Sequence, residues 1–269
     1  MGDVCHTCTA CGITKARSLR TQYNVHKNSE NDLVIALAGN PNVGKSTIFN
    51  TLTGLRQHTG NWPGKTVTQA QGNFQHRGRN FILVDLPGTY SLLSNSLDEE
   101  VARDFICFGQ PDATIVVVDA TCLARNLNLV LQVLEITPKA VLSVNLMDEA
   151  KSKGIHVDLD TLSRKLGVPV VGTTARTGAG LDELKEKVFQ IAHGYEETKP
   201  ISVVYDPEVD EVVQQLLPKV RPLLYGLNLN PYWVAMRLLD GDESFLQSLT
   251  RYTQRGELWQ EGDMALCPQ

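Results

Sequence analysis

The sequence predicts an α/β protein: a mostly parallel sheet with helices on both faces, followed by a small helical domain. Strand-like apolar segments alternate with helical patterns from about Asp32 to His193, which is typical of a parallel sheet covered on both faces. After about Tyr195, apolar residues recur at helical spacing instead. The chain has 269 residues, 42% of them hydrophobic, which is enough for one α/β core and a smaller second unit.

The expected elements follow one another in regular alternation. Strands are predicted near residues 33–38, 67–75, 79–84, 113–119, 139–145 and 169–172. Helices are predicted near 45–53, 97–108, 124–136, 159–166 and 180–193, with further amphipathic segments near 209–217, 233–239 and 245–249. We therefore divide the chain into a flexible N-terminal arm at 1–31, an α/β domain at 32–195 and a helical domain at 196–269.

The segment between the first strand and the first helix fits the pattern G-x-x-x-x-G-K-[ST], the phosphate loop of P-loop NTPases. Glycine lets the backbone wrap around a phosphate chain, and the N-terminus of the following helix favours an anion. Lys45 is expected to contact the β- and γ-phosphates, and the Ser46 hydroxyl is expected to bind Mg²⁺. The predicted phosphate-binding residues are Gly39, Asn40, Asn42, Val43, Gly44, Lys45, Ser46 and Thr47.

A second motif ends the strand predicted at 79–84. Asp85 is expected to hold Mg²⁺ through a water molecule, and the Gly88 N–H is expected to contact the γ-phosphate. A Pro-Gly pair after a strand is usually just a turn, so this motif gains its weight from its place after the phosphate loop. The residues assigned to it are Asp85, Leu86, Pro87 and Gly88.

A third motif, at the end of the strand predicted at 139–145, indicates which base is bound. The Asp148 carboxylate can accept two parallel hydrogen bonds from guanine, whereas adenine lacks that pair of donors. Asn145 is expected to hold the phosphate loop, and the N–H groups of Thr174 and Ala175 are expected at the guanine oxygen. The predicted guanine-binding residues are Asn145, Met147, Asp148, Thr174, Ala175 and Arg176, and the predicted ligands are GTP and GDP.

Charge and targeting signals bear on partners and location. Residues 196–269 carry 12 acidic and 6 basic side chains, so the helical domain is a poor partner for nucleic acid or an anionic membrane surface. The excess of acidic side chains is equally consistent with a helical surface that only contacts solvent. The N-terminus matches neither a secretory signal nor a myristoylation pattern, and no stretch approaches the roughly 18 apolar residues of a membrane span. We expect a cytoplasmic location with reduced cysteines.

Cys5, Cys8 and Cys11 form two C-x-x-C steps near the N-terminus. Their spacing is that of a ligand set for Fe or Zn, although no fourth ligand is evident nearby. A redox-labile tail explains the same residues equally well. Cys107 and Cys122 are expected in the core.

The motifs together carry a family resemblance. The phosphate loop is similar to that of translation-factor-like small GTPases. Residues 61–68, Asn-Trp-Pro-Gly-Lys-Thr-Val-Thr, and residues 85–92, Asp-Leu-Pro-Gly-Thr-Tyr-Ser-Leu, narrow the resemblance. With Trp233-Val-Ala-Met-Arg-Leu-Leu-Asp-Gly-Asp242, the chain resembles the N-terminal cytosolic domain of the bacterial ferrous iron transport protein B (FeoB) family over about residues 32–250.

The resemblance implies further roles. Thr66 would be the switch I threonine that closes on Mg²⁺ and the γ-phosphate, and Asn42 would be a candidate K⁺ ligand beside the phosphates. Catalysis would then rest on Asn42, Lys45, Thr66 and Gly88, and the switch I contacts to the nucleotide would include Trp62, Pro63, Gly64, Lys65 and Thr66. Trp62 would shield the nucleotide or serve as a packing anchor, and Lys65 would be a second cation or a solvated lysine.

The resemblance also implies a function and partners. The helical domain would act like an inhibitor of GDP dissociation and couple the switches to a membrane transport domain of the same full-length protein, at the inner face of the bacterial membrane. Thr89 stands where many small GTPases have a water-positioning glutamine, so hydrolysis should be slow.

Several interpretations remain open at the level of sequence. Small accessory iron-transport proteins and a homo-oligomer are further candidate partners. A soluble assembly GTPase of the ribosome type, or a non-enzymatic, nucleotide-gated metal-sensing module, would also explain the motifs.

Overall fold

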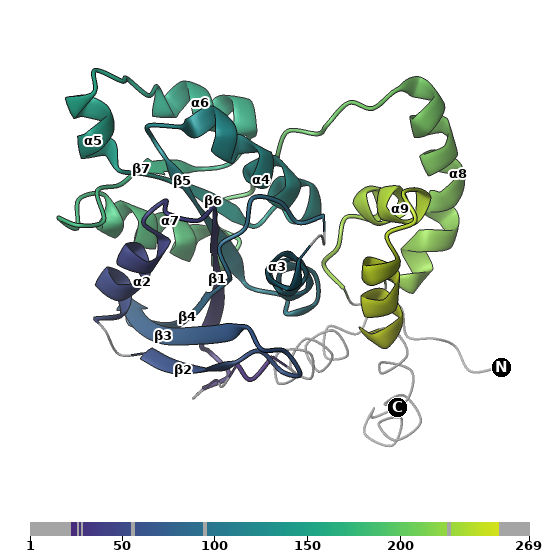
Figure 1. Ribbon diagram of the computed structural model, residues 1–269, viewed down its shortest axis with the longest axis horizontal. Coiled ribbons are helices and arrows are strands. Elements are labelled where there is room, and N and C mark those ends of the chain that lie inside the picture. The colour runs from purple at the N-terminus through teal and green to yellow at the C-terminus, as the bar shows by residue number, and fades with distance from the viewer. Residues whose placement is uncertain are drawn as a thin grey trace.

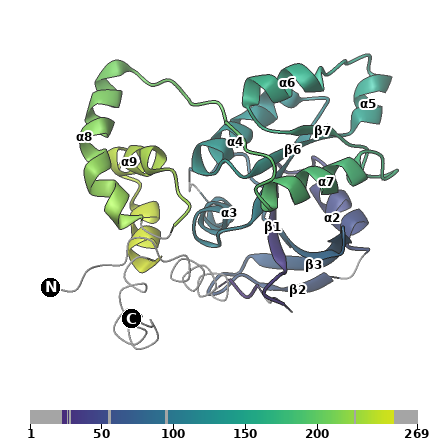
Figure 2. The same cartoon turned by 180° about the vertical axis from the view of Figure 1, so that it is seen from behind.

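The computed structural model describes residues 23–25, 27, 29–54, 57–93, 96–224 and 227–252. Their centre is a seven-stranded sheet with the strand order β2-β3-β4-β1-β5-β6-β7, covered by helices on both faces (Figure 1). A group of helices from the C-terminal part of the chain packs beside it (Figure 2). The mostly parallel α/β fold followed by helices, which the sequence predicts, is therefore confirmed.

The boundaries of the elements agree closely with the predicted ones. The strands are β1 (Leu33–Gly39), β2 (Gln57–Asn61), β3 (Thr68–His76), β4 (Arg79–Asp85), β5 (Ala113–Asp119), β6 (Ala140–Asn145) and β7 (Val170–Gly172). The helices are α2 (Lys45–Thr53), α3 (Leu97–Phe108), α4 (Leu123–Ile136), α5 (Met147–Ser152), α6 (Leu159–Leu166), α7 (Leu181–Ala192), α8 (Pro207–Leu223) and α9 (Pro231–Leu239). Residues 243–252 are also helical.

The sheet is parallel except at one edge. β1 lies between β4 and β5 and is parallel to both, and β5, β6 and β7 continue the parallel part. β3 runs antiparallel to β4, and β2 runs antiparallel to β3. Because parallel strands end at the same edge, the loops that follow β1, β4, β6 and β7 meet there. These are the loops that carry the predicted nucleotide motifs.

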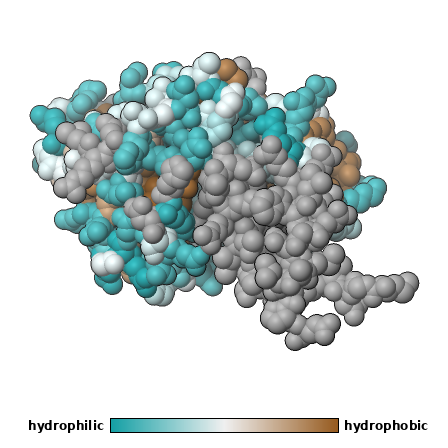
Figure 3. All heavy atoms as spheres, turned by 90° about the horizontal axis from the view of Figure 1, so that it is seen from below, coloured by the Kyte–Doolittle hydropathy of each residue, from teal (hydrophilic) through white to brown (hydrophobic). Residues whose placement is uncertain are grey.

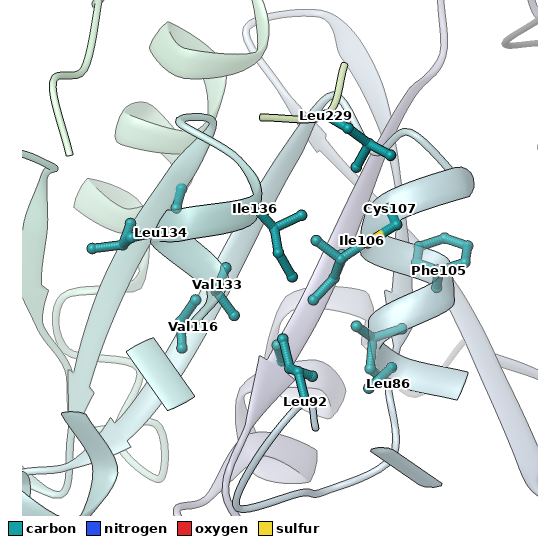
Figure 4. Close-up of a cluster of buried hydrophobic side chains, with 14 of the residues drawn as sticks. Leu86, Leu92, Phe105, Ile106, Cys107, Val116, Val133, Leu134, Ile136 and Leu229 are labelled. Atoms are coloured by element: carbon teal, nitrogen blue, oxygen red, sulfur yellow. The ribbon is translucent and has the colours of Figure 1, made fainter. Parts of the chain in front are cut away.

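Two hydrophobic layers sandwich the sheet. Successive side chains of β1 point to opposite faces, so Val34, Ala36 and Ala38 join the layer under α3 and α4, whereas Ile35 and Leu37 join the layer under α2 and α7. Figure 4 shows the first layer, where side chains from α3, from α4 and from the segment after β4 gather. Leu229, which precedes α9, reaches the same cluster, so the helical part shares a core with the α/β part.

Helix α3 is enclosed between the sheet and the helical part. All residues from Val101 to Phe108 are buried, as expected for a helix covered on every side. The Phe108 ring packs 4.3 Å from the Tyr252 ring and 6.0 Å from the Phe245 ring, measured between centroids. This helix is therefore the main joint between the two parts of the molecule.

A buried ionic contact reinforces this joint. Arg103 on α3 forms an ion pair of 2.7 Å with its neighbour Asp104 and donates a hydrogen bond of 2.8 Å to the Ser244 hydroxyl. The Ser248 hydroxyl donates to the second oxygen of Asp104 at 2.7 Å. Burial raises the pKa of Asp104, and the Arg103 guanidinium opposes that shift. Two residues of α3 are thereby bonded to two residues of the helical part.

The structure corrects several details of the prediction. The loop expected before residue 67 contains strand β2, which went unpredicted because its sequence, Gln-His-Thr-Gly-Asn, is polar and lies at the exposed edge of the sheet. Tyr23 and Val25 belong to the segment assigned to a flexible arm, yet both are buried in the core. Cys107 is buried as expected, but Cys122 is exposed at the start of α4.

The surface of the molecule is mostly polar on the face that Figure 3 shows. Hydrophilic side chains dominate the coloured part of the face shown in Figure 3, with only small apolar areas between them. In the part of the chain that the structure describes, no helix combines the length and apolar character that a membrane crossing requires.

Candidate nucleotide-binding site

The phosphate loop joins β1 to α2 with a backbone that few sequences can adopt. Asn42 and Gly44 have positive φ values of 65° and 82°, a conformation that asparagine tolerates and glycine favours. A Cβ atom at Gly44 would lie 2.3 Å from the Asn145 side chain, and one at Gly39 would lie 2.7 Å from the Val117 carbonyl oxygen. Both glycines are thus required by backbone conformation or by close packing, which supports the predicted loop.

Lys45 and Asp85, which come from two different motifs, lie together. The Lys45 amino group forms an ion pair with the Asp85 carboxylate and donates a hydrogen bond of 2.6 Å to the Leu86 carbonyl oxygen. Burial raises the pKa of Asp85, and Lys45 opposes that rise. Ser46 and Thr47 follow at the exposed N-terminal end of α2. The Ser46 hydroxyl at the start of α2 and the Asp85 carboxylate at the end of β4 are oxygen ligands of the kind that suits Mg²⁺.

Asn145 connects the phosphate loop to the loop after β7. Its side chain is fully buried, and its amide nitrogen donates to the Val43 carbonyl oxygen at 2.9 Å. Its amide oxygen accepts from the Ala175 N–H at 3.1 Å and from the Thr173 hydroxyl at 3.2 Å. The predicted role of Asn145 in holding the loop has a direct structural basis in these three bonds.

Most of the other groups predicted to bind the base already form hydrogen bonds within the protein. One oxygen of Asp148 accepts from Arg176 at 3.2 Å, and the other is buried without a hydrogen-bond partner in the described part of the chain. Met147 is half-buried beside them. In this structure the Thr174 N–H donates to the Ala179 carbonyl oxygen and the Ala175 N–H to the Asn145 amide oxygen, and their contact with the guanine oxygen stays a prediction.

The segment predicted to be switch I, residues 62–67, forms the turn of the β2–β3 hairpin. Pro63, Gly64 and Thr66 are exposed in this turn. Of the two roles expected for Trp62, the structure shows the packing anchor, because the ring is buried against Tyr23 and Phe105, at 6.1 Å and 5.3 Å between ring centroids. An aromatic ring gains more from burial beside other rings than from exposure at a hairpin turn.

The neighbouring lysine is also drawn toward α3. The Lys65 amino group forms an ion pair of 2.5 Å with Glu100, so it is neither a solvated lysine nor a cation at the phosphates in this structure. Together, Trp62 and Lys65 attach switch I to α3.

The segment after β4 lies against the phosphate loop. The Leu86 N–H donates to Leu37 at 3.0 Å, and the Thr89 N–H donates to Gly39 at 3.3 Å. A Cβ atom at Gly88 would touch Pro41 at 3.4 Å, so Gly88 lies beside the loop, and its contact with the γ-phosphate stays a prediction. The Thr89 hydroxyl bonds to the Ser91 carbonyl oxygen, which leaves it turned toward its own segment.

The sequence did not indicate the buried state of Asn40, and it indicated a cysteine cluster that lies outside the described residues. Both amide atoms of Asn40 are buried without a partner in the described part of the chain, a feature that the motif alone does not reveal. Cys5, Cys8 and Cys11 lie outside the described residues. Among the residues that are described, no cluster of three or more histidine, cysteine or acidic side chains could hold a metal ion.

Comparison with known proteins gives consistent matches. Residues 33–188 match the family model described as Ferrous iron transport protein B, and residues 205–263 match the model described as FeoB cytosolic helical domain. A protein of Escherichia coli strain K12 named Fe(2+) transporter FeoB is 39% identical over 216 residues, 78% of this chain and 27% of that protein. A protein of the same name from Salmonella typhimurium strain LT2 is 46% identical over 157 residues, 57% of this chain and 20% of that protein. The chain spans about a quarter of the length of the curated relatives it matches.

Solved structures show the same similarity. The cytosolic domain of the T. maritima FeoB iron transporter in apo form aligns with a TM-score of 0.72 at 39% identity, covering 82% of this chain and 86% of that chain. The same domain in a GMPPNP form gives 0.72 at 40% identity, with the same coverage of 82% and 86%. The cytosolic domain of L. pneumophila FeoB gives 0.70 at 31% identity, covering 83% of this chain and 96% of that chain.

Proposed function

The chain belongs to the ferrous iron transport protein B (FeoB) family, and on that premise we propose that its α/β domain is a GTP-binding switch that hydrolyses GTP slowly. The observation that carries the proposal is the position of Asn145, which bonds to the phosphate loop on one side and to the loop after β7 on the other. A phosphate site and a base site are thereby held at one edge of the sheet. Relatives whose solved structures are described as GDP and GMPPNP forms support the same ligand class.

The residues at this edge have separable roles in the proposal. Lys45 leaves Asp85 to bind the β- and γ-phosphates, and Gly88 contacts the γ-phosphate through its N–H. Ser46 and Asp85 hold Mg²⁺, which neutralises charge on the phosphates. Thr66 would complete the site after switch I leaves α3. Hydrolysis is slow because the Thr89 hydroxyl, engaged with Ser91, cannot orient water as a glutamine amide does.

Base recognition can be tested by changing Asp148, the carboxylate expected to accept two hydrogen bonds from guanine. The purified chain should bind GDP and not ADP, as measured by calorimetry. Asp148→Asn replaces an acceptor pair by one acceptor and one donor, so it should weaken GDP and favour xanthosine diphosphate, whose ring presents a donor and a carbonyl oxygen. Arg176→Ala, which removes the salt-bridge partner of Asp148, is the matched control and should retain the preference for GDP. Equal binding of ADP and GDP would refute the guanine assignment.

We propose K⁺ activation as a finer feature of the same site. Asn42 is exposed in the phosphate loop with a positive φ, and its side-chain oxygen is a donor of the kind that K⁺ accepts. GTP hydrolysis should be faster in K⁺ than in Na⁺ buffer, and Asn42→Ala should abolish the difference. Equal rates in both salts would refute the K⁺ mechanism without affecting GTP binding.

Control of Fe²⁺ uptake is the broadest part of the proposal. The matched relatives are named Fe(2+) transporters and are much longer than this chain, so a membrane transport domain is the proposed partner and the inner face of the bacterial membrane the proposed location. The test is a chimera in which this chain replaces the cytosolic part of a full-length relative. Iron uptake should then fall when Lys45→Ala abolishes nucleotide binding, and uptake that is indifferent to this change would refute the gating role.

A further inference from the structure

Helix α4 presents a row of three polar side chains to the segment that follows Gly88. Arg125, Asn128 and Gln132 are spaced three and four residues apart, which places them on one face of the helix. Each contacts part of residues 90–92. We call residues 86–93, which follow β4, switch II. We call these three residues the α4 row.

Gln132 makes the strongest contacts of the row. Its amide oxygen accepts a hydrogen bond of 2.7 Å from the Leu92 N–H and one of 3.3 Å from the Ser91 hydroxyl. The Leu92 side chain is 3% exposed and points into the core cluster of Figure 4. The backbone at residues 91–92 is therefore fixed by hydrogen bonds and by burial together.

Asn128 and Arg125 fix the preceding residue. The Asn128 amide donates to the Tyr90 carbonyl oxygen at 3.3 Å, and the Arg125 guanidinium lies 4.7 Å from the centre of the Tyr90 ring. On the other side of Gly88, Leu86 is bonded to β1. Gly88 consequently lies in a short span that is anchored at both ends.

Two of the groups assigned to GTP binding are engaged with other protein groups in this structure. Lys45 is bonded to Asp85 and Leu86 rather than placed for a phosphate, and switch I is attached to α3 through Trp62 and Lys65. Contacts that stabilise this arrangement alone must lower the affinity of any ligand that requires another arrangement. The α4 row contacts the segment that carries Gly88, the residue assigned to the γ-phosphate.

We propose that the α4 row positions switch II in the GDP-bound protein and thereby sets how strongly the protein prefers GDP to GTP. The proposal rests on the proposed GTP-binding function and assigns Arg125, Asn128 and Gln132 as positioning residues. GDP has no γ-phosphate to attract Gly88, so its binding does not require switch II to leave the row. GTP binding does, and its affinity is reduced by the free energy of those contacts.

The test is the ratio of the affinity for a GTP analogue to the affinity for GDP. Fluorescent GDP and a non-hydrolysable GTP analogue are titrated against the intact chain and against Gln132→Ala. Loss of two neutral hydrogen bonds should leave GDP affinity unchanged and raise the affinity for the GTP analogue about tenfold, which corresponds to ~1.4 kcal/mol. Gln132→Glu keeps an acceptor for the Leu92 N–H and should not raise the ratio. Gln215→Ala, at an exposed position of α8, is the control glutamine substitution and should behave as the unchanged chain.

Asn128→Ala guards against a folding artefact. Asn128 is exposed, so its replacement should leave the fold intact and change the ratio in the same direction by a smaller factor. An unchanged or lowered ratio in both variants would overturn the proposal, as would a parallel fall of both affinities, since that would show a purely structural role. Failure of the unchanged chain to bind either nucleotide would instead refute the proposed function.

Discussion

Replacing Asn145 with alanine should weaken both the fold and nucleotide binding. The substitution removes three buried hydrogen bonds, to Val43, Thr173 and Ala175. Each contributes about 1 kcal/mol net, so the free energy of unfolding should fall by about 3 kcal/mol. For a chain of this size, that corresponds to a decrease in melting temperature of about 6–12 °C. GDP affinity should fall at least about tenfold, because the phosphate loop loses its support.

Two further variants separate the contribution of the bond to Val43 from those of the bonds to Thr173 and Ala175. Asn145→Asp keeps an acceptor for Ala175 and Thr173 but cannot donate to Val43, so its stability should lie between those of the unchanged chain and the alanine variant. Its GDP affinity should be as low as that of the alanine variant, since the same bond to the phosphate loop is lost. Asn73→Ala, at an exposed position of β3, is the matched control and should change neither quantity.

The assays are thermal unfolding followed by circular dichroism and GDP titration by calorimetry. A decrease in melting temperature below about 2 °C for Asn145→Ala would show that the three hydrogen bonds contribute little. Unchanged GDP affinity in Asn145→Asp would show that the bond to Val43 does not hold the phosphate loop. Either result would refute the reasoning that places Asn145 at the centre of the site.

Three further substitutions test other contacts. Arg103→Met should lower the free energy of unfolding by about 3–5 kcal/mol, because it leaves Asp104 buried without its cation; a loss below about 1 kcal/mol in urea denaturation would contradict this. Asn40→Ala should raise the unfolding free energy by about 1 kcal/mol in the absence of nucleotide, because it removes buried amide atoms that lack partners, and a lower melting temperature would count against it. The hydrogen bond from His76 lowers the pKa of Glu186 below its usual 4.5, so this carboxylate stabilises the fold above that pH and ceases to do so as the pH falls through the lowered value. Glu186→Gln should therefore reduce the slope of the urea midpoint against pH in that acidic range, and an unchanged slope would show that the pair does not contribute.

The phosphate loop and the Asn145 contacts could be predicted because their constraints are local and chemical. A loop that wraps phosphate needs glycine at particular positions, and the structure shows that Gly39 and Gly44 have no room for a side chain. The distance between Asn145 and the loop follows from the parallel sheet, in which β1, β5 and β6 end at the same edge. The order of the motifs and of the strands was therefore enough to predict that Asn145 lies close to the phosphate loop.

The position of Trp62 could not be predicted in the same way. Whether its ring faces the nucleotide or the core depends on Tyr23 and Phe105, which are distant in the sequence and leave no mark on the motif itself. The position of Lys65 depends likewise on Glu100. Side chains of a turn are placed by whatever surface the turn meets, and that surface is a property of the tertiary structure.

One missed feature did have a signal in the sequence. Residues 101–108, Val-Ala-Arg-Asp-Phe-Ile-Cys-Phe, are apolar on nearly every side of a helix and contain adjacent opposite charges. A helix without a polar face must be covered all round, and charges within it must be paired. The enclosed position of α3 and the Arg103–Asp104 pair both follow from that pattern, although their partners in the helical part do not.

The stacking of Tyr23 on Tyr252 has a consequence for how the domain is connected. Their ring centroids are 5.9 Å apart, so the first and last stretches of the described chain meet at one corner of the molecule. A pull applied to the backbone at Tyr23 or at Tyr252 would therefore act first on this pair of rings. It would next reach α3, to which Tyr23 is joined through the Asp104 carbonyl oxygen.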